Sequence, residues 1–425
     1  MKITSDQIND LNNKHASRLN EEYDQLANRL VSRNIDLNDL DDKLSTFQIA
    51  IPSWALGTGG TRFGRFSGGG EPGSLEEKIN DIGLLHKLNN SSGFISLHIP
   101  WDIPENYDHI NQLAADLHLK FDSVNSNTFQ DQPDSIHSYK FGSLDHHDND
   151  TRQLAVDHNK EVIDHGERLG AKSLTVWLAD GASFPGQKNF RKAFQNLSLS
   201  LQEIYNHLPE DWKLLIEYKP YEPNFYSMTI PDWGTSHLLA QQLGKKAYSL
   251  VDLGHHLPNT NIEQIVAILM HQNKLGGFHF NDSKYGDDDL TVGSLKPYQL
   301  FLIFNELVEG ITNTDNITPA WMIDASHNLK DPLEDLIQSV EAILIAYCRA
   351  LIIDQNALAY AQQNNDVAGC QEILQDAFMT DVRPLIAKNR LNNHASVNPL
   401  EAYRNLNVRE TLIKERGSKQ ISSGL

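Results

Sequence analysis

The chain has 425 residues, of which 40% are hydrophobic, so it is long enough to form one large buried core. Its formal net charge of -20 would repel nucleic acid and anionic membranes, so neither is expected as a partner, and an enzyme for a neutral small molecule fits better. Two cysteines, Cys348 and Cys370, exclude a disulfide framework, and the lack of an apolar run of about 18 residues predicts a cytoplasmic protein.

Strand-like and helix-like segments alternate along most of the chain. A polar, helix-like segment from Gln7 to Asn34 comes first, and polar helical sequence returns after Asp331. Between them we predict eight strands, at 48–54, 94–100, 121–125, 173–178, 214–219, 248–253, 277–281 and 320–324. The pattern divides the chain into an N-terminal helical segment (1–46), a catalytic barrel (47–330) and a C-terminal helical extension (331–425).

Eight apolar strands joined by helices predict an α/β fold with an all-parallel sheet, and their number favours closure into a (β/α)₈ TIM barrel. The alternative is an open, doubly wound sheet. That fold usually shows a Gly-x-Gly-x-x-Gly turn after an early strand, with an acidic residue about 20 positions later, and the sequence lacks this combination. In a barrel, the functional site is expected at the carboxyl ends of the strands.

Four short apolar runs within the predicted strands each end in a carboxylate or a histidine, namely Glu217, Asp252, His279 and Asp324. An acid or an imidazole at the end of a buried strand is costly unless something compensates its lost hydration, and a divalent cation does so. A single acid at such a place is more often a helix cap or an ion-pair partner. Four of them on successive strands predict a shared metal site.

Further ligand candidates follow two of these strands. His255 lies three residues after Asp252, with His256 as an alternative, and Asp287 and Asp289 form an acid-x-acid pair after the next strand. The whole set is too large for one six-coordinate cation, so it favours two cations that share a carboxylate. Mixed oxygen and imidazole ligands suit Mn²⁺ or Mg²⁺ better than Zn²⁺.

Four more residues near strand ends are candidates for contact with a substrate. Lys219, two residues beyond Glu217, could act as an electrophile toward a polarised carbonyl, or it could be an ordinary rim lysine. His98 could shuttle a proton during the opening of a sugar ring, or it could be a core histidine. Trp54 and Trp177 could face the apolar side of a sugar, or they could belong to the core.

Two loop segments invite a functional interpretation. The glycine-rich run after the first strand lacks the Gly-Lys-Ser/Thr ending of a phosphate-binding loop, so residues 57–73 are predicted to form a mobile lid. Residues 145–148 contain two histidines between two aspartates, but their position before a helix favours a solvated loop over a metal site.

Six longer motifs are far more specific than single residues. They are PSWA (52–55), GTGGTRF (57–63), SLHIPWD (96–102), NSNTF (125–129), VDLGHH (251–256) and FHFNDSKYGDDD (278–289). Together they resemble the broad-specificity bacterial L-rhamnose isomerases, which are relatives of the xylose isomerases, and the resemblance covers nearly the whole chain.

The resemblance implies two metal sites in each subunit. A structural Mn²⁺ would be held by Glu217, Asp252, His279 and Asp324. A catalytic Mn²⁺ would be held by His255, Asp287 and Asp289, with Asp252 shared between the two ions. Mg²⁺ or Co²⁺ would be substitutes for Mn²⁺.

The resemblance also implies roles around the sugar. The catalytic residues would be His98, which meets the ring oxygen or O5, together with Lys219 and Asp324. Lys219 and Ser326 would lie near O1 to O3. The apolar walls would be Trp54, Phe129, Trp177 and Phe63, the last reaching over from a neighbouring subunit of a homotetramer.

The reaction implied by the resemblance interconverts L-rhamnose and L-rhamnulose, with broad aldose specificity, by a metal-assisted hydride shift between C1 and C2. One alternative is a sugar isomerase or epimerase with another substrate, for example D-allose and D-psicose. Another is a non-catalytic sugar-binding protein with a structural cation. His255, Asp287 and Asp289 speak against that second alternative, because a structural site alone would not need them.

Overall fold

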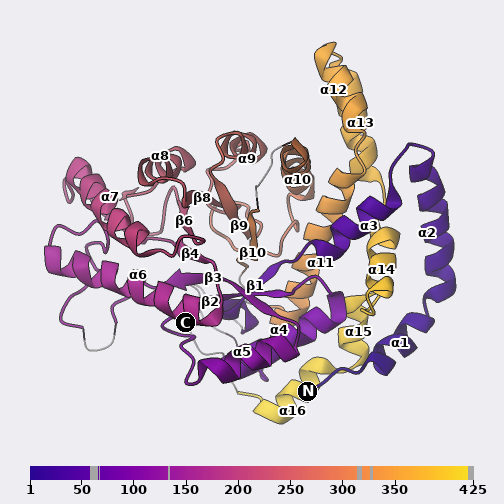
Figure 1. Ribbon diagram of the computed structural model, residues 1–425, viewed down its shortest axis with the longest axis horizontal. Coiled ribbons are helices and arrows are strands. Elements are labelled where there is room, and N and C mark those ends of the chain that lie inside the picture. The colour runs from indigo at the N-terminus through magenta and orange to yellow at the C-terminus, as the bar shows by residue number, and fades with distance from the viewer. Residues whose placement is uncertain (58–65, 67, 133–134, 314–317, 326–328, 420–425) are drawn as a thin grey trace.

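The computed structural model describes residues 1–419 except 58–65, 67, 133–134, 314–317 and 326–328. Eight parallel strands close into a barrel in the order β1-β10-β9-β8-β6-β4-β3-β2 (Figure 1). These strands are β1 (Ala50–Pro52), β2 (Phe94–Ile99), β3 (Lys120–Ser126), β4 (Ser173–Val176), β6 (Lys213–Glu217), β8 (Ala247–Asp252), β9 (Leu275–Phe280) and β10 (Ala320–Ile323). The predicted TIM barrel is confirmed, and each predicted strand contributes to it.

Helices cover the outside of the barrel (Figure 1). Between the strands lie α4 (Leu75–Asn89), α5 (Tyr107–Asp116), α6 (Asn149–Leu169), α7 (Phe190–His207), α8 (Trp233–Leu243), α9 (Ile262–His271) and α10 (Pro297–Asn313). After β10, α11 (Pro332–Leu351) packs against α10 and α4 and completes this layer. The sequence-based boundary at residue 330 therefore falls just before a helix that covers the barrel, and the division into domains stays a prediction.

The first strand is shorter than the sequence predicts. Its ladder pairs Ala50 to Pro52 with β2, and Pro52 has no backbone N–H with which to continue it. Residues Ser53–Leu56 then form a short 3₁₀ helix, η1. Trp54 is consequently held in a turn at the end of β1 and not in the strand itself.

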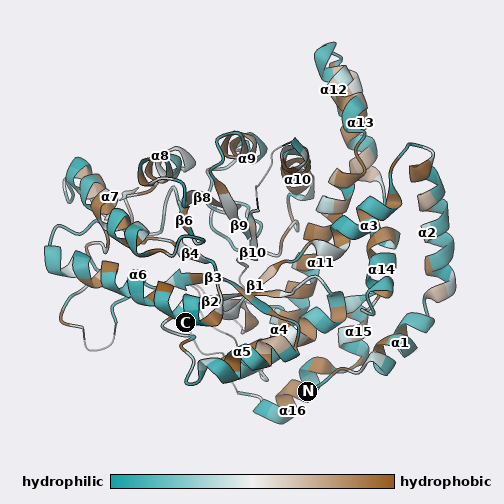
Figure 2. Ribbon diagram, viewed as in Figure 1, coloured by the Kyte–Doolittle hydropathy of each residue, from teal (hydrophilic) through white to brown (hydrophobic). Residues whose placement is uncertain are grey.

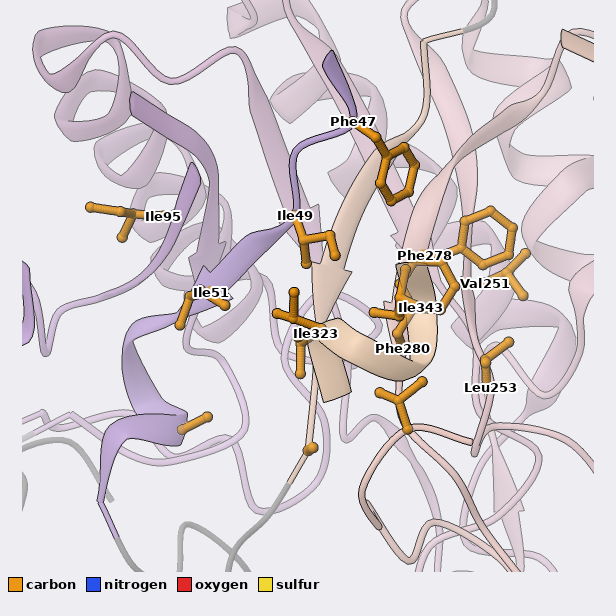
Figure 3. Packing of buried hydrophobic residues seen from close by; sticks show 14 of the residues in the cluster. Phe47, Ile49, Ile51, Ile95, Val251, Leu253, Phe278, Phe280, Ile323 and Ile343 are labelled. Carbon is orange, nitrogen blue, oxygen red and sulfur yellow. The ribbon is translucent and has the colours of Figure 1, made fainter. Parts of the chain in front are cut away.

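The core lies between the strands and the surrounding helices. Figure 3 shows Ile51, Phe280 and Ile323 from three different strands beside Ile343 of α11. A second, small apolar cluster contains Ala50, Leu215, Leu250 and Met322. Because side chains alternate along a strand, β1, β6, β8 and β10 each supply residues to both clusters. The helices turn apolar faces toward the sheet and polar faces outward (Figure 2).

The two ends of the chain pack against each other beside the barrel. The N-terminal helices are α1 (Ser5–Asn13), α2 (Ala16–Val31) and α3 (Leu37–Thr46), and the C-terminal ones are α12 (Gln355–Gln363), α13 (Val367–Met379), α14 (Arg383–Asn392), α15 (Pro399–Asn405) and α16 (Val408–Arg416). Helix α14 packs on α2 and α3. The buried side chain of Asn12 donates to the Ala395 carbonyl (2.9 Å) and accepts from the Val397 N–H (3.0 Å). In contrast, α12 and α13 project away from this region (Figure 1).

Both cysteines are in helices, as the sequence predicts. Cys348 is buried in α11, Cys370 is partly buried in α13, and both are free thiols. Across the described residues, no single helix has the length and apolar character needed to cross a membrane, although α11 and α12, joined with a 64° bend, meet that test as a pair.

Candidate metal centre

The four strand-end groups predicted from the sequence converge at the carboxyl end of the barrel. Glu217 ends β6, Asp252 ends β8, and His279 is the last residue but one of β9; only 3%, 1% and 2% of their respective surfaces are exposed. Nδ1 of His279 lies 3.2 Å from Oε1 of Glu217, 3.8 Å from Oδ2 of Asp252 and 3.6 Å from Oδ2 of Asp324. One imidazole nitrogen therefore faces three carboxylates.

This arrangement fits a bound cation. An imidazole nitrogen carries at most one proton, so His279 can donate a hydrogen bond to only one of the three carboxylates at a time. The remaining negative charge is buried, where it is costly without compensation. A divalent cation among the same four atoms would be bound by all of them, and imidazole with carboxylates is a suitable donor set for Mn²⁺ or Mg²⁺.

A second group of possible ligands adjoins the first. Asp252, His255 and Asp287 offer ligand atoms that all lie within 4.8 Å of one another, as do Glu217, Asp252 and His279. His255 bridges the two groups, with Nδ1 3.1 Å from Oε1 of Glu217 and Nε2 3.3 Å from Oδ1 of Asp287. Because Asp252 belongs to both groups, the geometry can accommodate two neighbouring cations with one shared carboxylate.

The structure separates the two histidines that the sequence leaves as alternatives. His255 faces the carboxylates, whereas Nε2 of His256 lies 2.7 Å from the hydroxyl of buried Tyr218. Burial lowers the pKa of His256 to about 3, and the neighbouring His255 adds to this effect. His256 is thus a neutral side chain behind the centre, bonded to Tyr218, and His255 is the ligand candidate.

The remaining predicted ligands lie at the edges of the centre. Asp324 follows β10, and its Oδ1 accepts a hydrogen bond from Nε1 of Trp54 (2.8 Å). Asp289 has a left-handed backbone conformation (φ 46°) and stands beside Asp287. Burial and the Asp287 carboxylate hold the pKa of Asp289 well above its usual range. Two carboxylates this close share a proton unless a cation neutralises them.

The pKa values in the centre follow from burial and mutual pairing. Burial raises the pKa of Asp252 to about 7. Burial also opposes ionised Glu217, but the His279 and His255 imidazoles outweigh it and lower its pKa to about 2. Burial likewise opposes a charged His279, yet the Glu217 carboxylate raises its pKa to about 9. Protons therefore provide the positive charge in the metal-free centre, and a bound cation would replace them.

Two groups that donate hydrogen bonds to Asp252 were not among the site residues predicted from the sequence. Nδ2 of Asn281 donates to both carboxylate oxygens of Asp252 (3.0 and 3.1 Å), and the Gly254 N–H donates to Oδ1 (2.7 Å). A Cβ on Gly254 would lie 3.3 Å from that same oxygen, so the turn is tightly packed. The position of Asn281, two residues after His279 and so facing the same way, is a signal that could have revealed its role.

Aromatic side chains form a cluster next to the charged centre. The ring of His98, at the end of β2, stacks on Trp101 (centroids 4.2 Å apart) and meets Trp54 and Phe129 edge-on (5.6 and 5.5 Å). Phe129 in turn meets Trp177 (5.1 Å). Three of the predicted wall residues are thus brought together with His98, and Trp101, which was part of a motif but not predicted as a wall, joins them.

His98 is neutral and firmly held. Burial lowers its pKa to about 3, and Nδ1 has no hydrogen-bond partner among the described residues. Its backbone N–H donates to Oδ2 of Asp102 (2.9 Å). The buried Asp102 also accepts from Nζ of Lys78 (2.7 Å) and from the hydroxyl of Ser53, next to Trp54. Asp102 therefore ties the end of β1 to the end of β2.

Lys219 connects the aromatic cluster to the charged centre. Its ammonium is buried, lies 5.2 Å from the ring centroid of Trp177, and pairs with Asp287 (2.5 Å) and with Glu222. It is therefore not the ordinary rim lysine that the sequence left open. Glu222 is a further acid in the site that sequence reasoning missed.

The other expectations from the sequence either lie outside the described residues or are wrong. Phe63 and Ser326 lie outside the described residues, as does most of the predicted lid. The solvated-loop interpretation of residues 145–148 is wrong for Asp145, which is buried and paired with Lys188 (2.5 Å) and Thr229. The ammonium of Lys188 neutralises the charge of Asp145, and the hydroxyl of Thr229 donates a hydrogen bond to it.

The fold and the site define a parallel barrel whose carboxyl end gathers acids and histidines beside an aromatic cluster. The model of the family described as xylose isomerase-like TIM barrel matches residues 92–307. The chain is 48% identical over 410 residues to a protein of Rhizobium meliloti (strain 1021) named "Probable sugar isomerase", covering 96% of this chain and 95% of that one. This chain belongs to the xylose isomerase-like TIM barrel family.

Two further similarities agree with this assignment. A "Probable sugar isomerase" of Mesorhizobium japonicum is 47% identical over 407 residues, covering 96% of this chain and 94% of that protein. The solved structure of an L-ribulose 3-epimerase has a TM-score of 0.52 at 14% identity, covering 76% of this chain and 98% of that one. The latter likeness shows a shared fold.

Proposed function

We propose that this protein is a divalent-cation-dependent aldose–ketose isomerase. The observation that carries the proposal is that Asp252 belongs to two adjacent groups of candidate ligands. Contacts of Lys219 and Trp54 connect these groups to the aromatic cluster. Relatives that match almost the whole chain are named probable sugar isomerases, which supports the same class of reaction.

The substrate pair we propose is L-rhamnose and L-rhamnulose, with broad specificity for other aldoses. The six motifs that resemble the L-rhamnose isomerases support this choice. Aromatic rings suit the apolar faces of a deoxy sugar, which has a methyl group in place of one hydroxymethyl group. We propose Mn²⁺, two ions per chain, as the metal, and a cytoplasmic homotetramer as the assembly, in which Phe63 of one chain and Ser326 complete the sugar pocket.

The residues of the pocket have separable tasks in the reaction. His98 is neutral, and its Nδ1 has no hydrogen-bond partner within the described part of the chain, so it can accept or return the proton that moves when the sugar ring opens. The ammonium of Lys219 can donate to the sugar oxygen at C1 or C2. The aromatic walls exclude water from the open chain. Cations held by the two groups of candidate ligands would supply Lewis acidity for the transfer of hydrogen between C1 and C2.

We propose a hydride shift in preference to an enediol route. Proton abstraction from carbon needs a base that is not engaged elsewhere. In the described part of the site, the carboxylates are either candidate ligands or, like Glu222, paired with Lys219. Substrate deuterated at C2 should therefore yield ketose that keeps the deuterium at C1.

The experiment that tests the proposal is a product assay on chelated protein with Mn²⁺, Mg²⁺ or Co²⁺ added back. The expected result is conversion of L-rhamnose to L-rhamnulose only with a cation present, and slower conversion of other aldoses. Interconversion of ketoses without any aldose would instead establish a 3-epimerase, the alternative suggested by the fold of the L-ribulose 3-epimerase. Full activity in protein shown to be metal-free would refute both.

A further inference from the structure

The last helix of the chain, α16, holds three segments on the side of the barrel where β1, β2 and β10 end. It lies on the same side of the molecule as α4 and α15 (Figure 1). Two of its arginines, Arg409 and Arg416, make nearly all of the polar contacts described below. We refer to these two residues as the α16 clamp.

Arg409 joins the loop after β1 to the helix after β10. Its Nε and Nη2 donate to the two carboxylate oxygens of Asp331 (2.9 and 2.6 Å), and Nη1 donates to the carbonyls of Gly69 and Gly70 (3.2 Å each). Asp331 also caps α11 by accepting the Leu333 N–H (2.9 Å). One planar guanidinium thus fixes two segments that approach the site from different strands.

Arg416 joins the same loop to α4. Its guanidinium pairs with both oxygens of buried Asp81 (2.8 Å each), and Nη1 also donates to the Gly70 carbonyl (3.1 Å). Asp81 is one helical turn from Lys78, whose ammonium reaches Asp102 beneath His98. A continuous chain of described contacts therefore connects α16 to the backbone of His98.

The loop is shaped to fit α16 closely. Gly69 and Gly70 have φ values of 78° and 68°, which favour glycine. The Gly70 N–H donates to the Gly417 carbonyl (2.9 Å). A Cβ on Gly70 would stand 2.7 Å from the backbone nitrogen of Ile413, so even one methyl group would push the loop and the helix apart.

We propose that Arg409 and Arg416 are positioning residues for the sugar pocket. By holding the loop after β1, α4 and the start of α11 in one arrangement, the clamp sets the spacing of the pocket residues Trp54, His98 and Asp324. Its partner Asp81 shares α4 with Lys78, which pairs with Asp102. Asp102 accepts from the His98 N–H and from the hydroxyl of Ser53, next to Trp54, and Trp54 in turn donates to Asp324. This inference rests on the proposed isomerase function, and it assigns a role to a helix far in sequence from every ligand and wall residue.

Two variants break the clamp in different ways, and each has a matched control. Arg409→Gln removes the charged guanidinium that pairs with Asp331, the N-cap of α11. Its control is Arg404→Gln, which breaks a bidentate pair with Glu334 in the first turn of the same helix. Gly70→Ala separates loop and helix without a change of charge. Its control is Gly170→Ala, which has a similar φ of 83° and open space around an added Cβ.

The expected result is a rise in KM for the aldose of at least fivefold in Arg409→Gln and Gly70→Ala, with kcat and metal content within twofold of the parent. Both controls should keep KM within twofold. Hydrogen exchange followed by mass spectrometry should also accelerate at residues 68–82 and 98–102 in the two clamp variants alone. Arg409→Lys, which keeps the charge but not the guanidinium, should give an intermediate KM.

The inference is overturned if the clamp variants melt at lower temperature than the parent but keep its KM and its exchange at residues 98–102, because the clamp would then only stabilise the fold. It is also overturned if the controls change KM as much as the clamp variants. A parent protein without activity on any aldose would defeat the proposed function instead, while the exchange comparison would still test the link between α16 and His98.

Discussion

At the carboxyl end of the barrel, the site residues on the two sides are held in position in different ways. On one side, Glu217, Asp252 and His279 are strand residues, and the ladder that pairs Asp252 with His279 fixes their relative positions. On the other side, Trp54 and Trp101 lie in turns beyond β1 and β2. The first side is set by strand register, whereas the second depends on contacts such as those of Asp102. Substitutions on the two sides should therefore affect different steps: metal binding on the first side, and binding and ring opening of the sugar, with the metal content unchanged, on the second.

The largest combined loss of bound metal and of kcat is expected from Glu217→Gln. Glu217 contacts both His279 and His255, so its loss removes charge from both groups of candidate ligands. We expect loss of both metals and a fall in kcat of about 10³-fold or more, equivalent to about 4 kcal/mol of transition-state stabilisation. Elemental analysis and steady-state kinetics measure this.

Asp287→Asn is the matched comparison for Glu217→Gln. Asp287 belongs only to the second group of candidate ligands, so this variant should be inactive yet retain one metal ion. Equal metal loss in the two variants would contradict the division into two groups.

The next largest effect should come from His98→Gln, on the aromatic side. Loss of the proton shuttle should lower kcat by about 10²-fold, the usual scale for general acid–base catalysis, while both metals remain bound. Because ring opening needs this shuttle, the open-chain fraction of the substrate should set the residual rate. Unchanged kcat in His98→Gln would mean that His98 only packs against Trp101.

Asn281→Leu should weaken metal binding without removing any ligand. The amide orients both oxygens of Asp252, and such outer partners contribute about 10–100-fold in metal affinity. Calorimetric titration with Mn²⁺ measures the change. An affinity equal to that of the parent would show that strand register and the Gly254 N–H orient Asp252 unaided.

Metal affinity should also depend on pH through the imidazoles. The pKa of His279 is raised to about 9, so it is protonated near pH 7 in the metal-free centre and must lose that proton to become a ligand. Affinity should therefore rise with pH, by about tenfold per unit for each imidazole deprotonated, up to about pH 9. Mn²⁺ titrations at pH 6, 7 and 8 test this, and affinity independent of pH would contradict it.

The smallest effect is expected from Trp101→Phe. The ring that stacks on His98 is shortened but not removed, so KM should rise about threefold and metal content should stay unchanged. Steady-state kinetics on two aldoses measure this. A loss of metal in Trp101→Phe would mean that the two sides of the site are not separable.

Sequence reasoning found the strand-register side better than the aromatic side. Groups at the ends of parallel strands meet at one edge of the sheet, so their convergence follows from the strand prediction alone. Trp101 and Glu222 were not predicted as site residues because their neighbours depend on the conformations of loops. A periodic pattern in the sequence does not predict such conformations. The partnership of Lys78 with Asp102 joins a helix to a loop, and nothing in the local sequence of either reveals it.

Long-range partners also explain the error at Asp145. Its surroundings are polar, which is typical of a solvated loop, but its ion-pair partner Lys188 and its hydrogen-bond partner Thr229 are 43 and 84 residues further along the chain. A buried charge is acceptable there only because these side chains compensate it. The early end of β1 was easier to predict from the sequence, because Pro52 itself lacks the N–H that a longer ladder would need.

The contact of Asn12 with Ala395 and Val397 has a consequence for biosynthesis. Its partners are 383 and 385 residues further along the chain, so they leave the ribosome long after α1 does. At about 5–20 residues per second, α1 waits on the order of 20–80 s for them. During that time the side-chain amide of Asn12 lacks the partners that it has in the folded protein, so the final docking of α1 must wait for residues 395–397.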